Sequence, residues 1–183
     1  MDFHDWLARR FGSVCHLFYP DGMATQPDSL CFTDEPPIAA DVARGVTRLF
    51  CRQDLFGICE MPLPNGRRAD IMAIDGKGGL TIVEIKVSKA DLVGDGKWQD
   101  YLDYCDRFFW AVPPSLAAIC EGERFLSGEA GLIVADRYDA VIVREAGIRP
   151  LAPARRKAEL LRFARRAARR LATQIDPSLG EAF

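Results

Sequence analysis

The sequence predicts an α/β fold in which helices flank one mixed central sheet. Three observations support this prediction. Short apolar runs are separated by turn signals, two of them are joined by the hairpin signal PNG, and the runs alternate with stretches of helical periodicity. The chain has 183 residues, of which 49% are hydrophobic and 27% are charged. This length and composition indicate one globular domain with a sizeable core.

The first part of the chain is predicted to be an N-terminal extension over residues 1–35, made of a short helix and a loop rich in turn formers. The short helix is expected from apolar side chains at helical spacing, namely Phe3, Trp6, Leu7 and Phe11. Residues 37–52 favour a second helix, because their apolar side chains fall on one stripe: Ile38, Val42, Val46 and Leu49.

Three predicted strands follow this second helix. Residues 56–63 and 67–75 flank the turn PNG, whose Asn-Gly pair is a strong short-range hairpin signal. Residues 80–88 follow the turn GKGG, which only a glycine-rich segment fits comfortably. The three strands are therefore expected to form consecutive hairpins.

The C-terminal half predicts a helix at residues 96–105 and a long helix at 152–172. Further apolar runs predict strands at 107–113, 131–135 and 140–146. With the helix and strands before them, these elements define an expected main domain over residues 36–175, followed by a tail at 176–183.

Charged side chains interrupt two of the apolar strands. Asp70 lies in the run ADIMAI, and Glu84 and Lys86 lie in TIVEIKV. Buried charges are costly unless they pair or bind an ion. Glu84 and Lys86 are two residues apart and share one face of a strand. With an odd number of loop residues in the GKGG turn, Asp70 lies opposite Glu84, and a three-residue PNG loop places Glu60 opposite Asp70.

Such a row of carboxylates is self-repelling unless a cation lies among its oxygens. Mg²⁺ is a suitable ion, because it prefers one or two carboxylates together with water and substrate phosphate. From the residues alone an alternative stays open, in which Glu84 and Lys86 form a paired, solvated edge of the sheet.

Net charge and cysteine usage restrict the function further. The formal net charge is −2, but residues 155–170 hold eight Lys and Arg against one Glu, which can create a positive face. That face can bind phosphates or can simply be the soluble outer side of the helix, whose buried side is expected to contain Leu160, Leu161, Phe163, Ala164, Ala168 and Leu171. The six cysteines form no C-x-x-C pair, which argues against a zinc cluster and favours buried, reduced thiols.

The order of elements around these charges resembles the PD-(D/E)xK restriction-endonuclease-like superfamily. An Asp on one strand, Asp70, is followed fourteen residues later by the E-x-K motif EIK, and then by helix and strand. More closely, CEMPLPNGRRADIMAID, VEIKVSKADL, KWQDYLDYCDRFFWAVPP, GLIVAD and LAPARRKAELLRFARR resemble the MmcB-like DNA repair family over about residues 38–172. The Gln-x-x-x-Tyr pair of some superfamily members is not matched, because Gln99 is followed four residues later by Asp103.

The resemblance implies a restriction-endonuclease-like fold and a Mg²⁺-dependent nuclease acting in DNA repair, with Mn²⁺ as an alternative ion. It implies that Asp70 and Glu84 hold the metal and that Lys86 positions the attacking water. In our mechanistic hypothesis the Ile85 carbonyl is a further ligand, and Glu60 is an additional or water-bridged one. An ammonium among carboxylates favours its charged form, so Lys86 is expected to orient the water rather than to remove its proton.

DNA is the expected partner, together with other repair proteins. Cationic and aromatic side chains near the predicted site are candidates for contact with it: Arg67, Arg68, Lys89, Lys97 and Trp98. Core packing is the alternative for Trp98. The main rival function is a catalytically inactive DNA-binding or scaffold protein with the same fold. A nucleotide hydrolase is disfavoured, because no G-x-x-x-x-G-K-[ST] motif occurs.

A cytoplasmic, nucleoid-associated location in a bacterium is expected. The N-terminal sequence MDFHDWLARRFG has no long apolar stretch of the kind found in signal peptides. No apolar run approaches the ~20 residues that span a bilayer.

Overall fold

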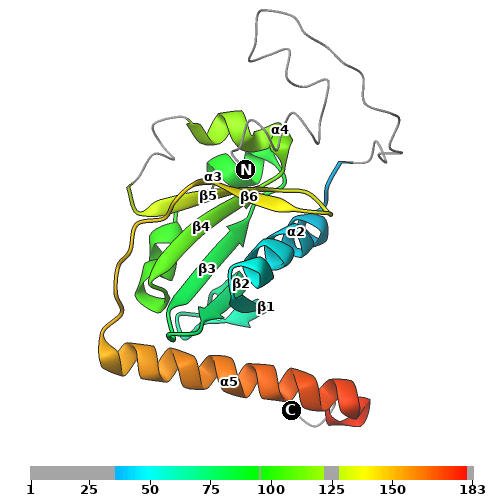
Figure 1. Cartoon of the computed structure of the whole chain (residues 1–183), viewed down its shortest axis with the longest axis vertical. Coiled ribbons are helices and arrows are strands. Elements are labelled where there is room, and N and C mark those ends of the chain that lie inside the picture. The colour runs from blue at the N-terminus through cyan, green and yellow to red at the C-terminus, as the bar shows by residue number, and fades with distance from the viewer. Residues whose placement is uncertain (1–35, 95, 122–127, 181–183) are drawn as a thin grey trace, which may run out of the picture.

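The computed structural model describes residues 36–94, 96–121 and 128–180. A six-stranded sheet forms its centre, with the strands in chain order from one edge to the other (Figure 1). The strands are β1 (Leu55–Pro62), β2 (Arg68–Asp75), β3 (Leu80–Ile85), β4 (Arg107–Val112), β5 (Ala130–Ala135) and β6 (Ala140–Arg144). The helix predicted within residues 1–35 lies outside the described residues.

The sheet is mixed, as predicted. Strands β1, β2 and β3 pair antiparallel, β3, β4 and β5 pair parallel, and β6 returns antiparallel to β5. The parallel pairs require crossover connections. The helix α3 (Lys89–Gly94) and the 3₁₀ helix η2 (Trp98–Tyr104) connect β3 to β4. The segment from β4 to β5 contains α4 (Pro114–Ala117) and η3 (Ala118–Glu121).

Both predicted hairpin registers are confirmed. Leu63 donates its N–H to the Arg67 carbonyl at 2.8 Å, which leaves a three-residue loop, and Gly66 in that loop has a φ of 80°. In the second hairpin Ile74 lies opposite Leu80. These pairings determine which side chains face each other along the regular parts of the three strands.

Two apolar cores lie on opposite faces of the sheet. The helix α2 (Ala39–Arg52) covers one face (Figure 1) and buries Val42, Val46 and Phe50. On the other face Phe108 and Trp110 pack with their ring centroids 5.2 Å apart. The segment η2 covers that second core.

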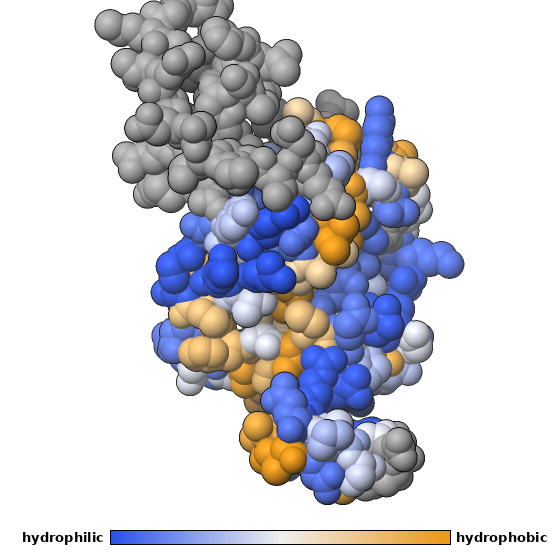
Figure 2. Space-filling model, turned by 90° about the vertical axis from the view of Figure 1, so that its right-hand side faces the viewer, coloured by the Kyte–Doolittle hydropathy of each residue, from blue (hydrophilic) through white to orange (hydrophobic). Residues whose placement is uncertain are grey.

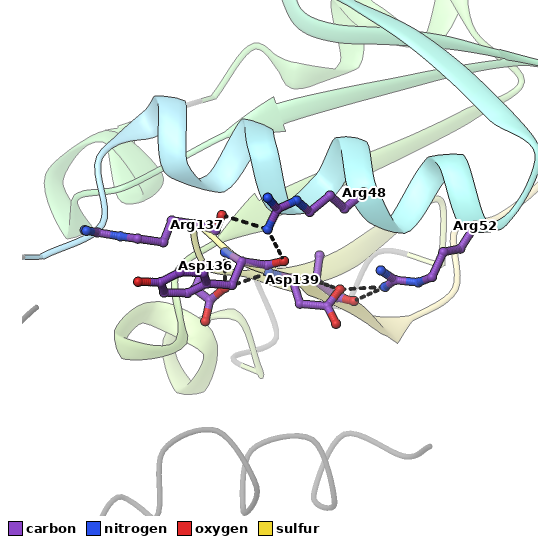
Figure 3. A network of polar contacts seen from close by, with 7 residues as sticks. Arg48, Arg52, Asp136, Arg137 and Asp139 are labelled. Atoms are coloured by element: carbon purple, nitrogen blue, oxygen red, sulfur yellow. Dashed lines mark hydrogen bonds and ion pairs between the residues drawn. The ribbon is translucent and has the colours of Figure 1, made fainter. Parts of the chain in front are cut away.

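The helix α2 lies against the turn between β5 and β6. Figure 3 shows Arg48 and Arg52 reaching from α2 to this turn. Arg48 donates to the Tyr138 carbonyl at 2.7 Å, and Arg52 donates to the Asp139 carboxylate at 2.6 Å. A Cβ on Gly45 would lie 2.2 Å from the Asp136 carbonyl oxygen, so only glycine permits this approach.

We therefore expect Gly45→Ala to destabilise the protein by about 1–3 kcal/mol, because the helix must move away from the turn. Chemical denaturation of both proteins measures this change. Gly94→Ala is the matched control, since a Cβ on Gly94 has no heavy atom within 4 Å. Equal stabilities of the two variants would contradict the proposed close contact.

Some predicted elements differ from the structure. The third strand was expected to extend to residue 88 but ends at Ile85. Ser88 instead begins α3, because its hydroxyl accepts the Asp91 N–H at 3.1 Å and donates to the Asp91 carboxylate at 2.8 Å. This reciprocal bonding is typical of a helix N-terminus. The element predicted at 96–105 is a 3₁₀ helix, η2.

The C-terminal helix α5 (Pro153–Ile175) lies below the sheet in Figure 1, followed by the 3₁₀ helix η5 (Pro177–Gly180). Its predicted buried side is largely wrong, since Leu161 and Leu171 are 60% and 59% exposed, Ala164 and Ala168 are exposed as well, and only Leu160 and Phe163 are half-buried. Figure 2 shows hydrophobic surface at this end of the molecule. Glu159 is instead fully buried, with Arg155 and Arg162 as ion-pair partners. Two of the basic side chains on this helix thus pair with one buried carboxylate.

Asp106 attaches α5 to the sheet. Its carboxylate accepts the N–H groups of Leu80 and Leu151 at 2.8 and 2.9 Å. Arg156 of α5 donates two hydrogen bonds to the same carboxylate, at 2.6 and 2.7 Å. The start of β4, the start of β3 and the first turn of α5 therefore meet at one buried acid.

Candidate active site

The candidate site lies where β1 and β2 change the faces to which their side chains point. Cys59 and Ile71 pack on the α2 side, whereas Met61 and Ala69 pack on the η2 side. Residues two apart on a regular strand share a face, so each strand is irregular between these positions. Glu60, with a φ of 57°, and Asp70 are the residues at the change.

At this irregularity the Asp70 carboxylate, in place of a backbone carbonyl, accepts a hydrogen bond from the neighbouring strand. Its Oδ2 atom accepts the N–H of Ile85 at 2.7 Å, a side-chain bond between β2 and the end of β3. The ladder between β2 and β3 ends at the pair Ile71 and Val83, one residue before Asp70 and Glu84. Asp70 is nevertheless close enough to Glu84 to raise the pKa of that carboxyl. The predicted pairing of the two carboxylates across the ladder stays a prediction.

Glu84 and Lys86 form a close pair beside Asp70. The Lys86 ammonium donates to Glu84 Oε1 at 3.2 Å and lies 5.8 Å from the centroid of the Trp110 ring. Both side chains are largely buried, with exposed fractions of 14% for Lys86 and 9% for Glu84. The alternative of a paired but solvated sheet edge does not describe this pair, because little of it contacts water.

Burial gives the two carboxyl groups unusual acidity. It raises the pKa of Glu84 to about 7, and the neighbouring Asp70 carboxylate contributes to this rise while Lys86 opposes it. Burial also raises the pKa of Asp70, against the lowering effect of the Ile85 N–H and of Lys86. Perturbed carboxyls that share a site are typical of catalytic and metal-binding centres.

The donor set fits a divalent cation in one respect. Glu84 Oε2 is buried and forms no hydrogen bond of normal geometry, although the Tyr101 hydroxyl is close enough to lower the pKa of Glu84. A buried carboxylate oxygen without a well-placed donor is costly. A metal ion at this oxygen would remove that cost. Among residues 36–94, 96–121 and 128–180, however, no three or more His, Cys, Asp and Glu side chains already form a group that could hold one ion.

Glu60 is directed to another partner. It forms an ion pair with Arg68, and 47% of its side chain is exposed. It is near enough to Asp70 to raise the pKa of that carboxyl. The structure therefore brings together Asp70, Glu84 and Lys86, and places Glu60 at their border.

The residues predicted to contact DNA differ in their surroundings. Arg67 is paired with Asp100 at 2.7 Å, and Lys89 and Lys97 are exposed on the segment between β3 and β4. Trp98 packs against Phe108 with ring centroids 5.3 Å apart. This packing favours the core role for Trp98 over base stacking.

Tyr101 was not predicted as part of the site. Its hydroxyl donates to the Arg68 carbonyl at 3.3 Å. Burial raises its pKa, and the neighbouring Glu84 carboxylate raises it further. The aromatic residue near the E-x-K motif was visible in the sequence, but only the crossover from β3 to β4 brings it to Glu84.

A cleft of about 650 Å³ opens beside Asp70, on the α2 side of the sheet. One wall is α2, with small side chains and two arginines: Ala39, Ala40, Ala43, Arg44, Thr47 and Arg48. The other wall is the sheet, with Cys59, Glu60, Asp70 and Ile85. One predicted carboxylate ligand is thus accessible from an open groove.

Comparisons with known proteins agree with this architecture. A family model described as DNA repair protein MmcB-like matches residues 26–178. The chain belongs to the MmcB-like family. The matched residues include all six strands and most of the helices around the candidate site. The MmcB-like family is described as one of DNA repair proteins. No helix in the described part of this MmcB-like chain is long and apolar enough to cross a membrane.

A solved structure similar to this MmcB-like chain is the SPO1766 protein of unknown function from Silicibacter pomeroyi. It is 43% identical, and the match covers 80% of this chain and 96% of that one with a TM-score of 0.69. SfsA of Pyrococcus furiosus, solved in complex with Ca²⁺, is 13% identical over 71% of this chain and 75% of that one. The TM-score of that match is 0.36. No curated protein matches the sequence.

Proposed function

We propose that this DNA repair family member is a metal-dependent nuclease with a restriction-endonuclease-like fold, which hydrolyses phosphodiester bonds of DNA. The observation that carries the proposal is the buried Glu84 Oε2 atom without a hydrogen bond of normal geometry, on a carboxylate that lies beside Asp70 and Lys86. Carboxylates and an ammonium in this arrangement suit a phosphate, a cation and a water molecule.

In this proposal Asp70, Glu84 and the Ile85 carbonyl oxygen would hold Mg²⁺ or Mn²⁺, with Glu60 as an additional or water-bridged ligand. A bound divalent ion polarises the scissile phosphate and stabilises the charge that develops on attack. Lys86 orients the attacking water, because Glu84 holds its ammonium in place. The hydrogen bond from the Ile85 N–H fixes the Asp70 carboxylate and leaves its second oxygen for the ion.

The test is cleavage of labelled single-stranded, duplex, flapped, branched and abasic DNA with Mg²⁺ or Mn²⁺. We expect the wild-type protein to cut at least one structure, and Asp70→Asn and Lys86→Ala to cut it at least about 100-fold more slowly. Asp103→Asn, at an exposed position of η2, is the matched control and should retain the wild-type rate. Unchanged melting temperatures would show that the variants are folded.

Two outcomes would overturn the proposal. If the wild-type protein cuts none of these structures yet binds DNA equally with and without Mg²⁺, the protein is a DNA-binding or scaffold member of the repair machinery. If Lys86→Ala cuts at the wild-type rate, the assigned catalytic residues are wrong.

A further inference from the structure

The cleft between α2 and the sheet is lined on its helix side by unusually small residues. Ala39, Ala40, Ala43 and Thr47 form this wall, with Arg44 and Arg48 at its rim. Side chains this short leave the groove open, so that a polymer backbone can approach the helix closely. Asp70 and Glu60 lie on the opposite wall, so a chain in the groove passes these two carboxylates of the candidate active site.

The arginines of α2 differ in how strongly the protein holds them. Arg52 is paired with Asp139 at 2.6 Å, and Arg48 donates to the carbonyls of Tyr138 and Arg137 at 2.7 and 3.5 Å (Figure 3). These two guanidinium groups attach α2 to the turn between β5 and β6. They therefore have a structural role.

Arg44 is held much more weakly. Its ion pair with Asp41 is 4.0 Å long, and 58% of its side chain is exposed. Asp41 has closer partners, because Arg137 lies 3.4 Å from it and the Ile38 N–H donates to it at 3.2 Å. Arg44 can thus turn toward an anion in the cleft at little cost, since an exposed pair of this length contributes little.

Electrostatics favour a polyanion that brings cations with it over a neutral or acidic peptide. The sheet wall carries Glu60 and Asp70, which repel an isolated anion, while the rim carries Arg44 and Arg48. A phosphodiester strand meets both requirements, because one of its phosphates would pair with the Arg44 guanidinium at the rim. A divalent cation held by the carboxylates would offset the charge of the phosphate at the acidic wall.

We propose that the DNA strand to be cut lies in this cleft, and that Arg44 binds a phosphate of that strand next to the one at Asp70. This inference rests on the proposed nuclease function and adds the path of the substrate to it. Arg44 is a positioning residue here, since it holds a phosphate that does not react. DNA would therefore contact α2 as well as the predicted contact residues Arg67 and Lys97.

The test measures binding of fluorescently labelled single-stranded and duplex DNA by anisotropy at several salt concentrations, in EDTA and again in Ca²⁺. We expect Arg44→Ala to weaken binding about tenfold and to reduce the salt slope by about one, as for the loss of one phosphate contact. Arg52→Ala is the matched control on the same helix and should bind like the wild-type protein. Ala40→Glu, at an exposed position in the cleft, should weaken binding as well.

Each result has a defined meaning. Equal affinities and salt slopes for Arg44→Ala, Ala40→Glu and wild type would overturn the inference, even if the wild-type protein cleaves DNA. Weaker binding by Arg44→Ala and Ala40→Glu, but not by Arg52→Ala, would support it, even if the wild-type protein cuts nothing and the nuclease proposal fails. A wild-type protein that binds neither DNA form would overturn both.

Discussion

Replacing Asp106 by alanine is expected to lower the free energy of unfolding by about 3–5 kcal/mol at pH 7, the range for breaking a buried ion pair by removing one partner. The change leaves Arg156 without its carboxylate and the N–H groups of Leu80 and Leu151 without their acceptor. Buried donors without partners are costly. Urea denaturation followed by circular dichroism measures the loss.

The control is Asp100→Ala. Asp100 pairs with Arg67 at 2.7 Å, nearly as closely as Asp106 pairs with Arg156, but 56% of its side chain is exposed. An exposed pair contributes about 0–1 kcal/mol, so this variant should be close to wild type. If the two substitutions lower the free energy of unfolding equally, the burial of Asp106 and its hydrogen bonds to backbone N–H groups do not stabilise the protein.

The pH dependence of this effect has a definite sign. Burial alone would raise the pKa of Asp106, but the hydrogen bonds from Arg156, Leu80 and Leu151 overcome it, and the pKa lies below its ordinary value. The stabilisation is therefore present at neutral pH and is lost as the pH falls below the ordinary carboxyl range. The difference between wild type and Asp106→Ala should shrink in acid.

Glu84→Gln is expected to have the opposite pH signature. The pKa of Glu84 rises from 4.5 to about 7 on folding, so the folded protein holds this proton more tightly than the unfolded chain. The stabilisation is present below pH 4.5 and is lost as the pH rises through 7. In metal-free buffer this corresponds to about 3 kcal/mol between pH 4.5 and pH 8, and the glutamine variant should lack it.

The measurement is the free energy of unfolding in EDTA at a series of pH values. The pH-dependent part is compared, because any cost of the substitution that does not change with pH cancels in that comparison. Glu145→Gln, an exposed carboxyl at the end of β6, serves as the control and should keep the wild-type pH profile. A Glu84→Gln profile parallel to that of wild type would show that Glu84 is not the buried acid described above.

Much of the sheet could be predicted from local signals. The Asn-Gly turn and the glycine-rich turn each require backbone conformations that few other residues adopt, and they determined the registers of β1, β2 and β3. Helix α2 followed from its apolar stripe. The errors arose where local signals were weak: the end of β3 depended on the Ser88–Asp91 cap, and η2 depended on packing against Phe108 and Trp110.

The position of α5 shows what periodicity cannot supply. Its apolar residues predict one buried side, but the side that meets the sheet carries Arg156, Glu159 and Phe163. The bonds from Arg156 to Asp106 and the packing of Phe163 on the core select one orientation and leave Leu161 and Leu171 exposed. The partner of a charged residue far along the chain cannot be derived from local pattern.

The sequence by itself determined the registers of the two hairpins around Asp70, Glu84 and Lys86, because strand alternation and turn length are local properties of the chain. Only the tertiary structure decided how deeply these charges are buried, that Glu60 pairs with Arg68, and that α2 borders a cleft at Asp70. Those features depend on crossovers and on helix packing across the sheet. They join residues whose contacts no short stretch of sequence specifies.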